Sequence, residues 1–148
     1  MARMRRVMMA SDFSPASRAA FARAVELARA NRATLLLMHA VTLPPPTLGG
    51  EYIPPQTWER IETSARAAAQ KQLAALVAKA RRAGVRAVGL MMTGSPYEVI
   101  VRAARARRAD VLVLGTHGRT GLPRLFLGSV ASRVLATAPC PVLTVRGR

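Results

Sequence analysis

Two kinds of hydrophobic segment alternate along the chain. Short runs in which nearly every residue is apolar, such as Val7-Met8-Met9, are typical of strands covered on both faces. Longer segments have apolar residues three and four positions apart, as at positions 21, 24, 25 and 28, which indicates helices with one buried face. The pattern predicts strands at 4–10, 34–40, 85–92, 110–114 and 141–145, and helices at 14–31, 57–83, 95–108 and 129–136.

This alternation of strands and helices predicts an α/β protein. We expect a single domain over 1–148, a doubly wound five-stranded parallel sheet with helices on both faces. Ser14-Pro15 predicts the start of the first helix, with Ser14 as N-cap. Residues 42–56 contain three prolines in a row, Gly49-Gly50 and another proline pair, so we expect a long flexible surface loop without regular structure there.

Composition favours a cytoplasmic protein. The 148 residues are 51% hydrophobic and include one cysteine, Cys140, so no intrachain disulfide can form. The apolar run after Arg6 is interrupted by Asp12, which is too soon for a secretory signal. No stretch approaches the roughly 18 apolar residues of a membrane span. We therefore expect a cytoplasmic location and no membrane partner.

The net charge of the chain makes polyanion binding a second possible function class. Lys and Arg number 23 against 7 Asp and Glu, a net charge of +16 that attracts polyanions. The arginines are spread from Arg3 to Arg148, and the aromatic residues do not interleave with them as stacking platforms would. The sequence therefore favours an arginine-rich solvated surface over specific nucleic-acid binding, with a charge-driven polyanion-binding module as the alternative.

The strongest local signal for chemistry is a glycine-rich segment after the fourth predicted strand. Ligands of open parallel sheets bind beyond the carboxyl ends of the strands. Here Gly115, Gly118 and Gly128-Ser129 follow the spacing G-x2-G-x9-G-S, and Gly128-Ser129 precedes a helix whose N-terminus would attract phosphate. The segment is neither a Walker A loop nor a dinucleotide fingerprint. An ordinary glycine-rich loop is the simpler interpretation of the spacing alone.

The sequence resembles the universal stress protein (UspA-like) family over essentially the whole chain. The resemblance is carried by Ser11-Asp12-Phe13-Ser14, by His39, by Gly94-Ser95-Pro96 and above all by residues 115–146. It implies a Rossmann-like fold of the adenine nucleotide alpha hydrolase-like kind. In that family the complete glycine motif marks the ATP-binding branch, so the resemblance implies ATP as the ligand, with Mg²⁺ or Mn²⁺ held mainly by its phosphates.

The resemblance also implies a role for each matching position. Residues 10–12 and Ala40 would contact the nucleoside, while the glycine segment would surround the ribose and phosphates. Asp12 has an alternative role as a helix cap, and His39 is expected to be structural rather than a base. The implied nucleotide-binding residues are Ala10, Ser11, Asp12, Ala40, Leu114, Gly115, His117, Gly118, Arg119, Gly128, Ser129 and Val130.

The residues offer little for catalysis. The two aspartates, Asp12 and Asp110, are expected at opposite ends of the sheet, and no zinc spacing or Gly-x-Ser-x-Gly elbow is present. We expect no catalytic residues. The leading hypothesis is a nucleotide-dependent regulatory switch of the stress response, with a weak ATPase as a further alternative. The family resemblance also implies a homodimer through the strand at 142–145. The switch hypothesis also requires a further protein partner, which the sequence does not name.

Overall fold

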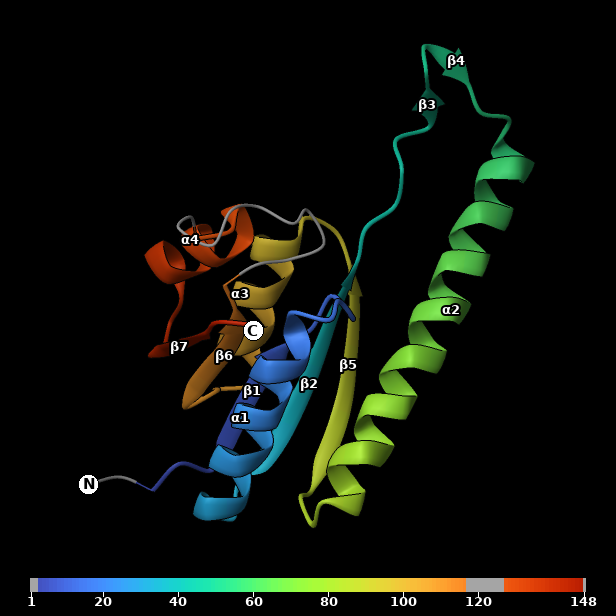
Figure 1. Cartoon of the computed structure of the whole chain (residues 1–148). Helices are drawn as coiled ribbons and strands as arrows, with labels where there is room; N and C mark the ends of the chain where they lie inside the picture. The colour runs from blue at the N-terminus through green and yellow to red at the C-terminus, as the bar shows by residue number, and fades with distance from the viewer. Residues whose placement is uncertain (1–2, 117–126, 148) are drawn as a thin grey trace.

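Five parallel strands form the central sheet of the protein (Figure 1). The computed structural model describes residues 3–116 and 127–147. The strands lie in the order β5-β2-β1-β6-β7, which confirms the predicted fold class. Their bounds are β1 Arg6–Ala10, β2 Thr34–Val41, β5 Ala87–Thr93, β6 Val111–Gly115 and β7 Val142–Val145.

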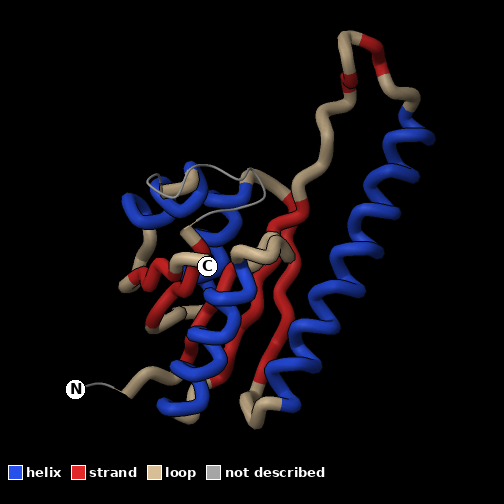
Figure 2. The backbone as a smooth tube through the Cα atoms, in the orientation of Figure 1, coloured by secondary structure: helices blue, strands red, loops and turns tan. Residues whose placement is uncertain are grey.

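Helices cover both faces of this sheet (Figure 2). The helices are α1 Ser17–Asn31 and α2 Pro55–Arg82 on one face, and α3 Pro96–Ala106 and α4 Ser129–Thr137 on the other. Alternate strand residues face opposite ways, so Val7 and Met9 pack under α1 while Met8 packs under α3 and α4. All three side chains are fully buried, which explains the continuous apolar run in the sequence.

The connections from β1 give the sheet a crevice. β1 pairs with β2 on one side and with β6 on the other. The chain passes from β1 to β2 and β5 on one side of β1, and then crosses back to β6 and β7 on the other side. Such a reversal of strand order opens a space beyond the carboxyl ends of the two strands between which it occurs, here β1 and β6. We call that side of the sheet, where the strands end, the carboxyl edge, and the side where they begin the amino edge.

The predicted loop at 42–56 is wrong in part. Thr47–Leu48 (β3) and Glu51–Tyr52 (β4) form a small antiparallel hairpin, and α2 begins at Pro55, two residues earlier than predicted. Gly49 and Gly50 adopt φ values of 62° and 85°, as both central residues of a type I′ turn require. The buried residues of α2 all lie in its second half, so its first half and the hairpin project from the body (Figure 1).

The start of α1 also differs from the prediction. The helix begins at Ser17 rather than beside Ser14, after a tight turn in which the Ser17 amide donates to the Ser14 carbonyl at 3.1 Å. The Ser14 hydroxyl still accepts from the same amide at 3.3 Å, although it is not the N-cap. Phe13 precedes this turn with φ 62°, a left-handed conformation uncommon for a non-glycine residue.

Candidate functional site

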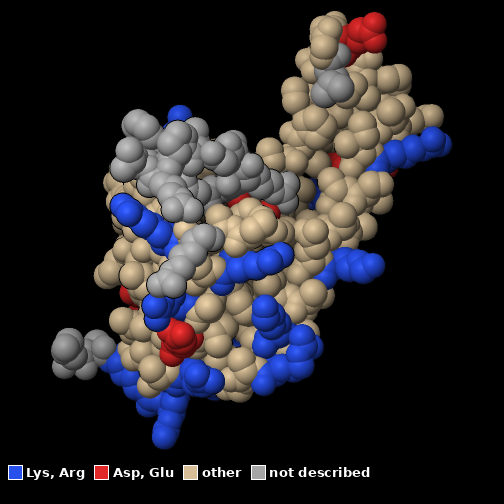
Figure 3. All heavy atoms as spheres, in the orientation of Figure 1, with Lys and Arg blue, Asp and Glu red and all other residues tan. Residues whose placement is uncertain are grey.

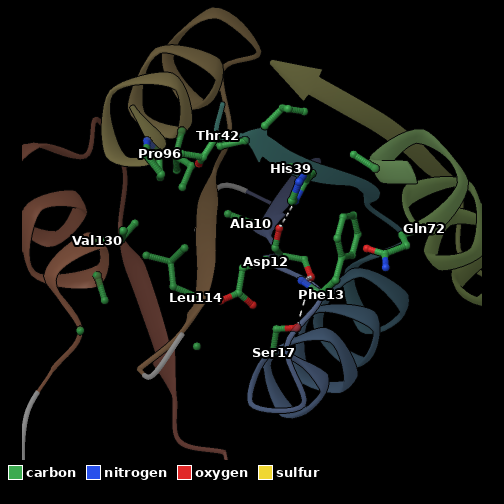
Figure 4. A pocket seen from close by; sticks show the side chains of 18 of the residues that line it. Ala10, Asp12, Phe13, Ser17, His39, Thr42, Gln72, Pro96, Leu114 and Val130 are labelled. Atoms are coloured by element: carbon green, nitrogen blue, oxygen red, sulfur yellow. Dashed lines mark hydrogen bonds between the residues drawn. The ribbon is translucent and has the colours of Figure 1, made fainter. Parts of the chain in front are cut away.

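A cavity of about 630 Å³ lies at the carboxyl edge, beyond the ends of the neighbouring strands β1 and β6 (Figure 4). Its volume falls in the range of roughly 300–1,000 Å³ typical of small-molecule sites. Four elements besides the strands supply its wall: α1, α2, α3 and the first turn of α4. The lining residues are Ala10–Phe13, Ser17, His39–Thr42, Ala65, Ala68, Ala69, Gln72, Pro96, Ile100, Leu114–Thr116 and Gly128–Ala131.

The structure brings most of the predicted binding residues to this cavity. They come from four segments: the ends of β1, β2 and β6, which are neighbouring strands, and the start of α4. The predicted residues that line it are Ala10, Ser11, Asp12, Ala40, Leu114, Gly115, Gly128, Ser129 and Val130. His117, Gly118 and Arg119 lie outside the described residues.

The turn after β1 forms one wall of the cavity. The buried hydroxyl of Ser11 accepts from the Phe13 amide at 3.1 Å and lies 3.2 Å from the Ser17 hydroxyl. The Asp12 carboxylate accepts from the Ser14 amide at 3.0 Å, which is a turn-capping contact. Asp12 is half-buried and lines the cavity (Figure 4), so the capping contact and a ligand contact are compatible.

His39 holds this turn in place from the neighbouring strand. Its Nδ1 lies 2.8 Å from the Ser11 carbonyl oxygen. Because a carbonyl only accepts, Nδ1 must carry the proton. The buried ring also stacks on Phe13, with centroids 4.2 Å apart and planes at 26°. These contacts match the structural role that the sequence favours for His39.

The N-terminus of α4 forms the opposite wall. Amides in the first turn of a helix have no carbonyl partner within it and carry the positive end of its dipole. Those of Ser129, Val130 and Ala131 belong to residues that line the cavity. The Gly128 amide donates to the Thr116 carbonyl at 2.8 Å, and a Cβ at Gly128 would lie 3.1 Å from that oxygen. Glycine therefore lets the chain approach β6 closely at the start of α4.

The charge of this cavity is low. Its described lining contains one carboxylate, Asp12, and no Lys or Arg, so backbone amides and hydroxyls supply the donors for an anion. Within residues 3–116 and 127–147, no three His, Cys, Asp or Glu side chains gather as a metal-ligand group.

No helix in the described part of the chain is long and apolar enough to cross a membrane.

Sequence reasoning missed one wall of the cavity entirely. Ala65, Ala68 and Ala69 of α2 recur at helical spacing and face the site, with Gln72 one turn further on. Their small side chains leave room for a ligand, but alanines at this spacing are equally typical of a packed helix face. Phe13 was also missed, although it directly follows the predicted Ser11-Asp12 pair.

The comparisons with known proteins identify the family. The universal stress protein family matches residues 4–146, so the chain belongs to this family. A universal stress protein of Thermus aquaticus is 36% identical over 95% of this chain and 97% of its own length.

Two solved structures share the fold. The universal stress protein UspA of Lactobacillus plantarum is 25% identical with a TM-score of 0.81, covering 99% of this chain and 100% of its own. An Arabidopsis thaliana family member, solved with AMP bound, is 26% identical with a TM-score of 0.70, covering 97% of this chain and 92% of its own.

Proposed function

We propose that this protein binds ATP in the carboxyl-edge cavity and acts as a nucleotide-dependent regulatory switch of the stress response in the cytoplasm. One observation carries the proposal: the N-terminal turn of α4 lines a cavity at the point where the strand order reverses. Both features favour a phosphate-bearing ligand, because the amides donate hydrogen bonds and the dipole attracts negative charge.

The two walls of the cavity suit the two ends of a nucleotide. Gly128, Ser129 and Val130 would hold the phosphates through amides and one hydroxyl. Ala10–Asp12 and Ala40, on the β1–β2 side, would border the adenosine, with Asp12 near the ribose or base. A Mg²⁺ or Mn²⁺ ion would be held mainly by the phosphates, with Asp12 and water completing its ligands.

The AMP-bound Arabidopsis relative supports an adenine nucleotide as the ligand class, since it shares the fold over nearly the whole chain. The triphosphate and the switch role rest on the glycine motif and the family resemblance. ATP would contact the chain on both sides of residues 115–128 and so change the surface offered to a partner protein.

Calorimetric titration with ATP and Mg²⁺, at about 150 mM salt to screen exposed charges, tests this proposal. GTP, AMP and inorganic triphosphate serve as comparison ligands. We expect saturable binding of ATP and AMP, with ATP bound more tightly than triphosphate because the adenosine wall adds contacts. Equal binding of ATP, GTP and triphosphate would refute a site that recognises adenine.

The variant Gly128→Glu provides the matching structural test. Its side chain would press on the Thr116 carbonyl and place a negative charge where the phosphates bind. We expect ATP affinity to fall by at least about 100-fold, roughly the loss of two charge-assisted hydrogen bonds, with thermal unfolding showing a retained fold. Ser132→Glu, an exposed position later in α4, adds the same charge away from the cavity and should bind normally.

We further propose a homodimer through β7. This four-residue strand lies at the end of the sheet, pairs with β6 on one side, and leaves Leu143 41% exposed. An apolar edge strand of this kind is stabilised by pairing with a second copy. Light scattering should give a dimer for the natural chain and a monomer for Leu143→Arg. A monomeric natural chain would contradict this proposal.

A further inference from the structure

Arginines concentrate at the amino edge of the sheet, opposite the cavity. They come from the start of β1 and the segment before it, from the ends of α1, α2 and α3 and the residues that follow α1 and α3, and from the position directly before β5. All are exposed, and Figure 3 shows Lys and Arg side chains over the lower part of the body, with others higher on the same face. The amino-edge arginines are Arg3, Arg5, Arg6, Arg29, Arg32, Arg81, Arg82, Arg86, Arg105, Arg107 and Arg108.

Hydrogen bonds between elements hold several of these guanidinium groups against this edge. Arg86 donates from Nη2 to the Arg32 carbonyl at 3.2 Å, which links the segment before β5 to the end of α1. Arg6 donates from Nη1 to the Arg107 carbonyl at 2.9 Å, which links β1 to the end of α3. Because a guanidinium has five N–H donors, most of its donors stay available after such a contact.

Little negative charge balances these arginines. Among the described residues, the carboxylate at the amino edge is Asp110, which accepts from the Arg5 and Arg6 amides at 2.7 and 2.8 Å. Neither of the two ion pairs in the described part of the chain includes an amino-edge arginine. The edge therefore presents a dense positive field to solvent.

Helix capping does not account for this concentration. The helix dipole favours basic residues in the last turn, which suits Arg29, Arg81 and Arg105. Arg5 and Arg6 instead lie at the start of a strand. Arg32 and Arg108 have φ values of 53° and 50°, a left-handed conformation in which glycine is the usual residue after a helix. The chain thus carries arginine where it costs backbone strain.

We infer that the amino edge is a binding surface for double-stranded nucleic acid, which it contacts through the phosphate backbone without reading sequence. The planar guanidinium group of arginine can donate two parallel hydrogen bonds to the oxygens of one phosphate. With strands about 4.8 Å apart, the span from β5 to β6 is roughly 14 Å, and duplex DNA carries about one charge per 1.7 Å of its axis. The surface thus meets several phosphates at once.

Two other anionic partners fit less well. Single strands are held by stacking on aromatic side chains, and no described aromatic residue lies at the amino edge. Membrane-surface segments insert large apolar side chains. Among the described residues, the exposed large hydrophobic side chains are Tyr52, Ile61, Val88, Leu127, Leu135 and Leu143. Val88 and Leu143 lie near the starts of β5 and β7, at opposite ends of the sheet, so they form no apolar cluster at the amino edge.

The test is fluorescence anisotropy with a labelled DNA duplex of about 20 base pairs, long enough to span the surface, over a series of salt concentrations. The key variant is the double change Arg32→Gly and Arg108→Gly, which removes two charges at positions where glycine relieves backbone strain. Each lost phosphate contact should make the slope of log affinity against log salt shallower by about 0.9. For two contacts we expect roughly 10- to 30-fold weaker binding at about 0.15 M salt.

The matched control removes two charges elsewhere. Arg18 near the start of α1 and Arg60 in the projecting half of α2 are both exposed, and neither is at the amino edge. The double change Arg18→Gln and Arg60→Gln should weaken duplex binding less than about threefold, since only the long-range field changes. Equal losses in the two double variants would overturn the proposal, because the binding would then depend on net charge alone.

Further probes separate the partner classes. A duplex RNA of the same length tests whether the edge accepts both helical forms, and affinity for either duplex supports the proposal. Tighter binding of a single-stranded oligonucleotide, or binding confined to phosphatidylserine vesicles, would overturn it. Thermal unfolding accompanies each variant, and the glycine variant should be at least as stable as the natural chain. This test does not depend on the proposed ATP site, which lies at the other edge.

Discussion

The two edges of the sheet are built from the ends of the same strands and have opposite chemistry. The carboxyl edge holds the described buried polar side chains, which are Ser11, Ser14, Ser17, His39 and Thr116. The amino edge has eleven exposed arginines among the described residues. Both arrangements attract anions, but the first does so with neutral donors that line a cavity and the second with exposed charge.

This difference determines what each edge can distinguish. Amides and hydroxyls that line a cavity have fixed directions, so they select a ligand by shape. Exposed guanidinium groups act at longer range and are screened within about 8 Å at physiological salt. We therefore expect a selective small-molecule site at one edge and a salt-dependent, sequence-independent surface at the other.

The largest expected effect is a loss of affinity for one ligand that leaves the affinity for the other unchanged, because the two edges are separate sites. Gly128→Glu should lower ATP affinity by at least about 100-fold and leave duplex affinity within about twofold, because the added charge is distant from the amino edge and screened. The Arg32→Gly and Arg108→Gly double variant should lower duplex affinity and leave ATP affinity unchanged. Calorimetry and anisotropy on the same preparations measure both quantities. If either variant weakened both ligands equally, the two edges would not be separate sites.

Next in size is the loss of the buried histidine. His39→Leu would leave the Ser11 carbonyl without its donor and remove the stack on Phe13. An unsatisfied buried acceptor costs about 1–3 kcal/mol, so we expect the free energy of unfolding to fall by about 2 kcal/mol. Urea denaturation measures this loss, and ATP affinity should fall as the Ser11–Ser14 turn loosens. Unchanged stability would show that His39 does not support the cavity wall.

A smaller effect is expected at the amino edge from Asp110. Hydrogen bonds from the Arg5 and Arg6 amides lower the pKa of its carboxyl group in the folded state. The stabilisation is therefore present above the unfolded value of about 3.9 and is lost as the pH falls through the lower folded value. Asp110→Asn should cost about 1 kcal/mol near pH 7, since one or both of these bonds weaken.

The pH dependence supplies the control for this variant. Because the asparagine side chain introduced by Asp110→Asn does not titrate, the stability difference between the natural chain and the variant should shrink on going from about pH 7 to about pH 3. Urea denaturation at both pH values measures it. A difference that stays constant with pH would contradict the assigned role of the carboxylate.

The smallest effect is a gain. Arg32→Gly alone relieves a left-handed backbone conformation, which costs a non-glycine residue about 1–2 kcal/mol, while the unfolded chain gains entropy from glycine. The net result should be a rise in unfolding free energy of a few tenths to about 1 kcal/mol, measured by urea denaturation. A loss of stability would mean that the arginine side chain itself supports the fold.

Much of the carboxyl edge was predictable from the sequence. Fully apolar runs indicate strands buried on both faces, and parallel strands place their carboxyl ends together. Together with the family resemblance, that reasoning brought Ser11-Asp12, Ala40 and Gly128–Val130 to one site, and the structure places them around one cavity. It missed the alanine wall of α2, because small residues on a helix face look the same whether they line a cavity or pack against a strand.

The hairpin at Thr47–Tyr52 shows a second limit. Prolines and glycines in the segment argued against regular structure, but Gly49-Gly50 is also the pair that a tight hairpin turn requires. Whether Gly49-Gly50 lies in an irregular loop or in a hairpin turn depends on whether the flanking residues pair as strands. That pairing cannot be recognised in the sequence of such a short segment.

The amino edge was decided by tertiary structure. Along the chain its arginines are scattered from Arg3 to Arg108, and the sequence analysis treated them as a dispersed solvated surface. The strands and helices could be predicted from hydrophobic periodicity, and the glycine motif could be recognised from residue spacing. Periodicity and spacing are both local properties of the sequence. The arginine surface depends on parallel connection instead, because every strand of the central sheet begins, and each of α1, α2 and α3 ends, on the same side of the sheet.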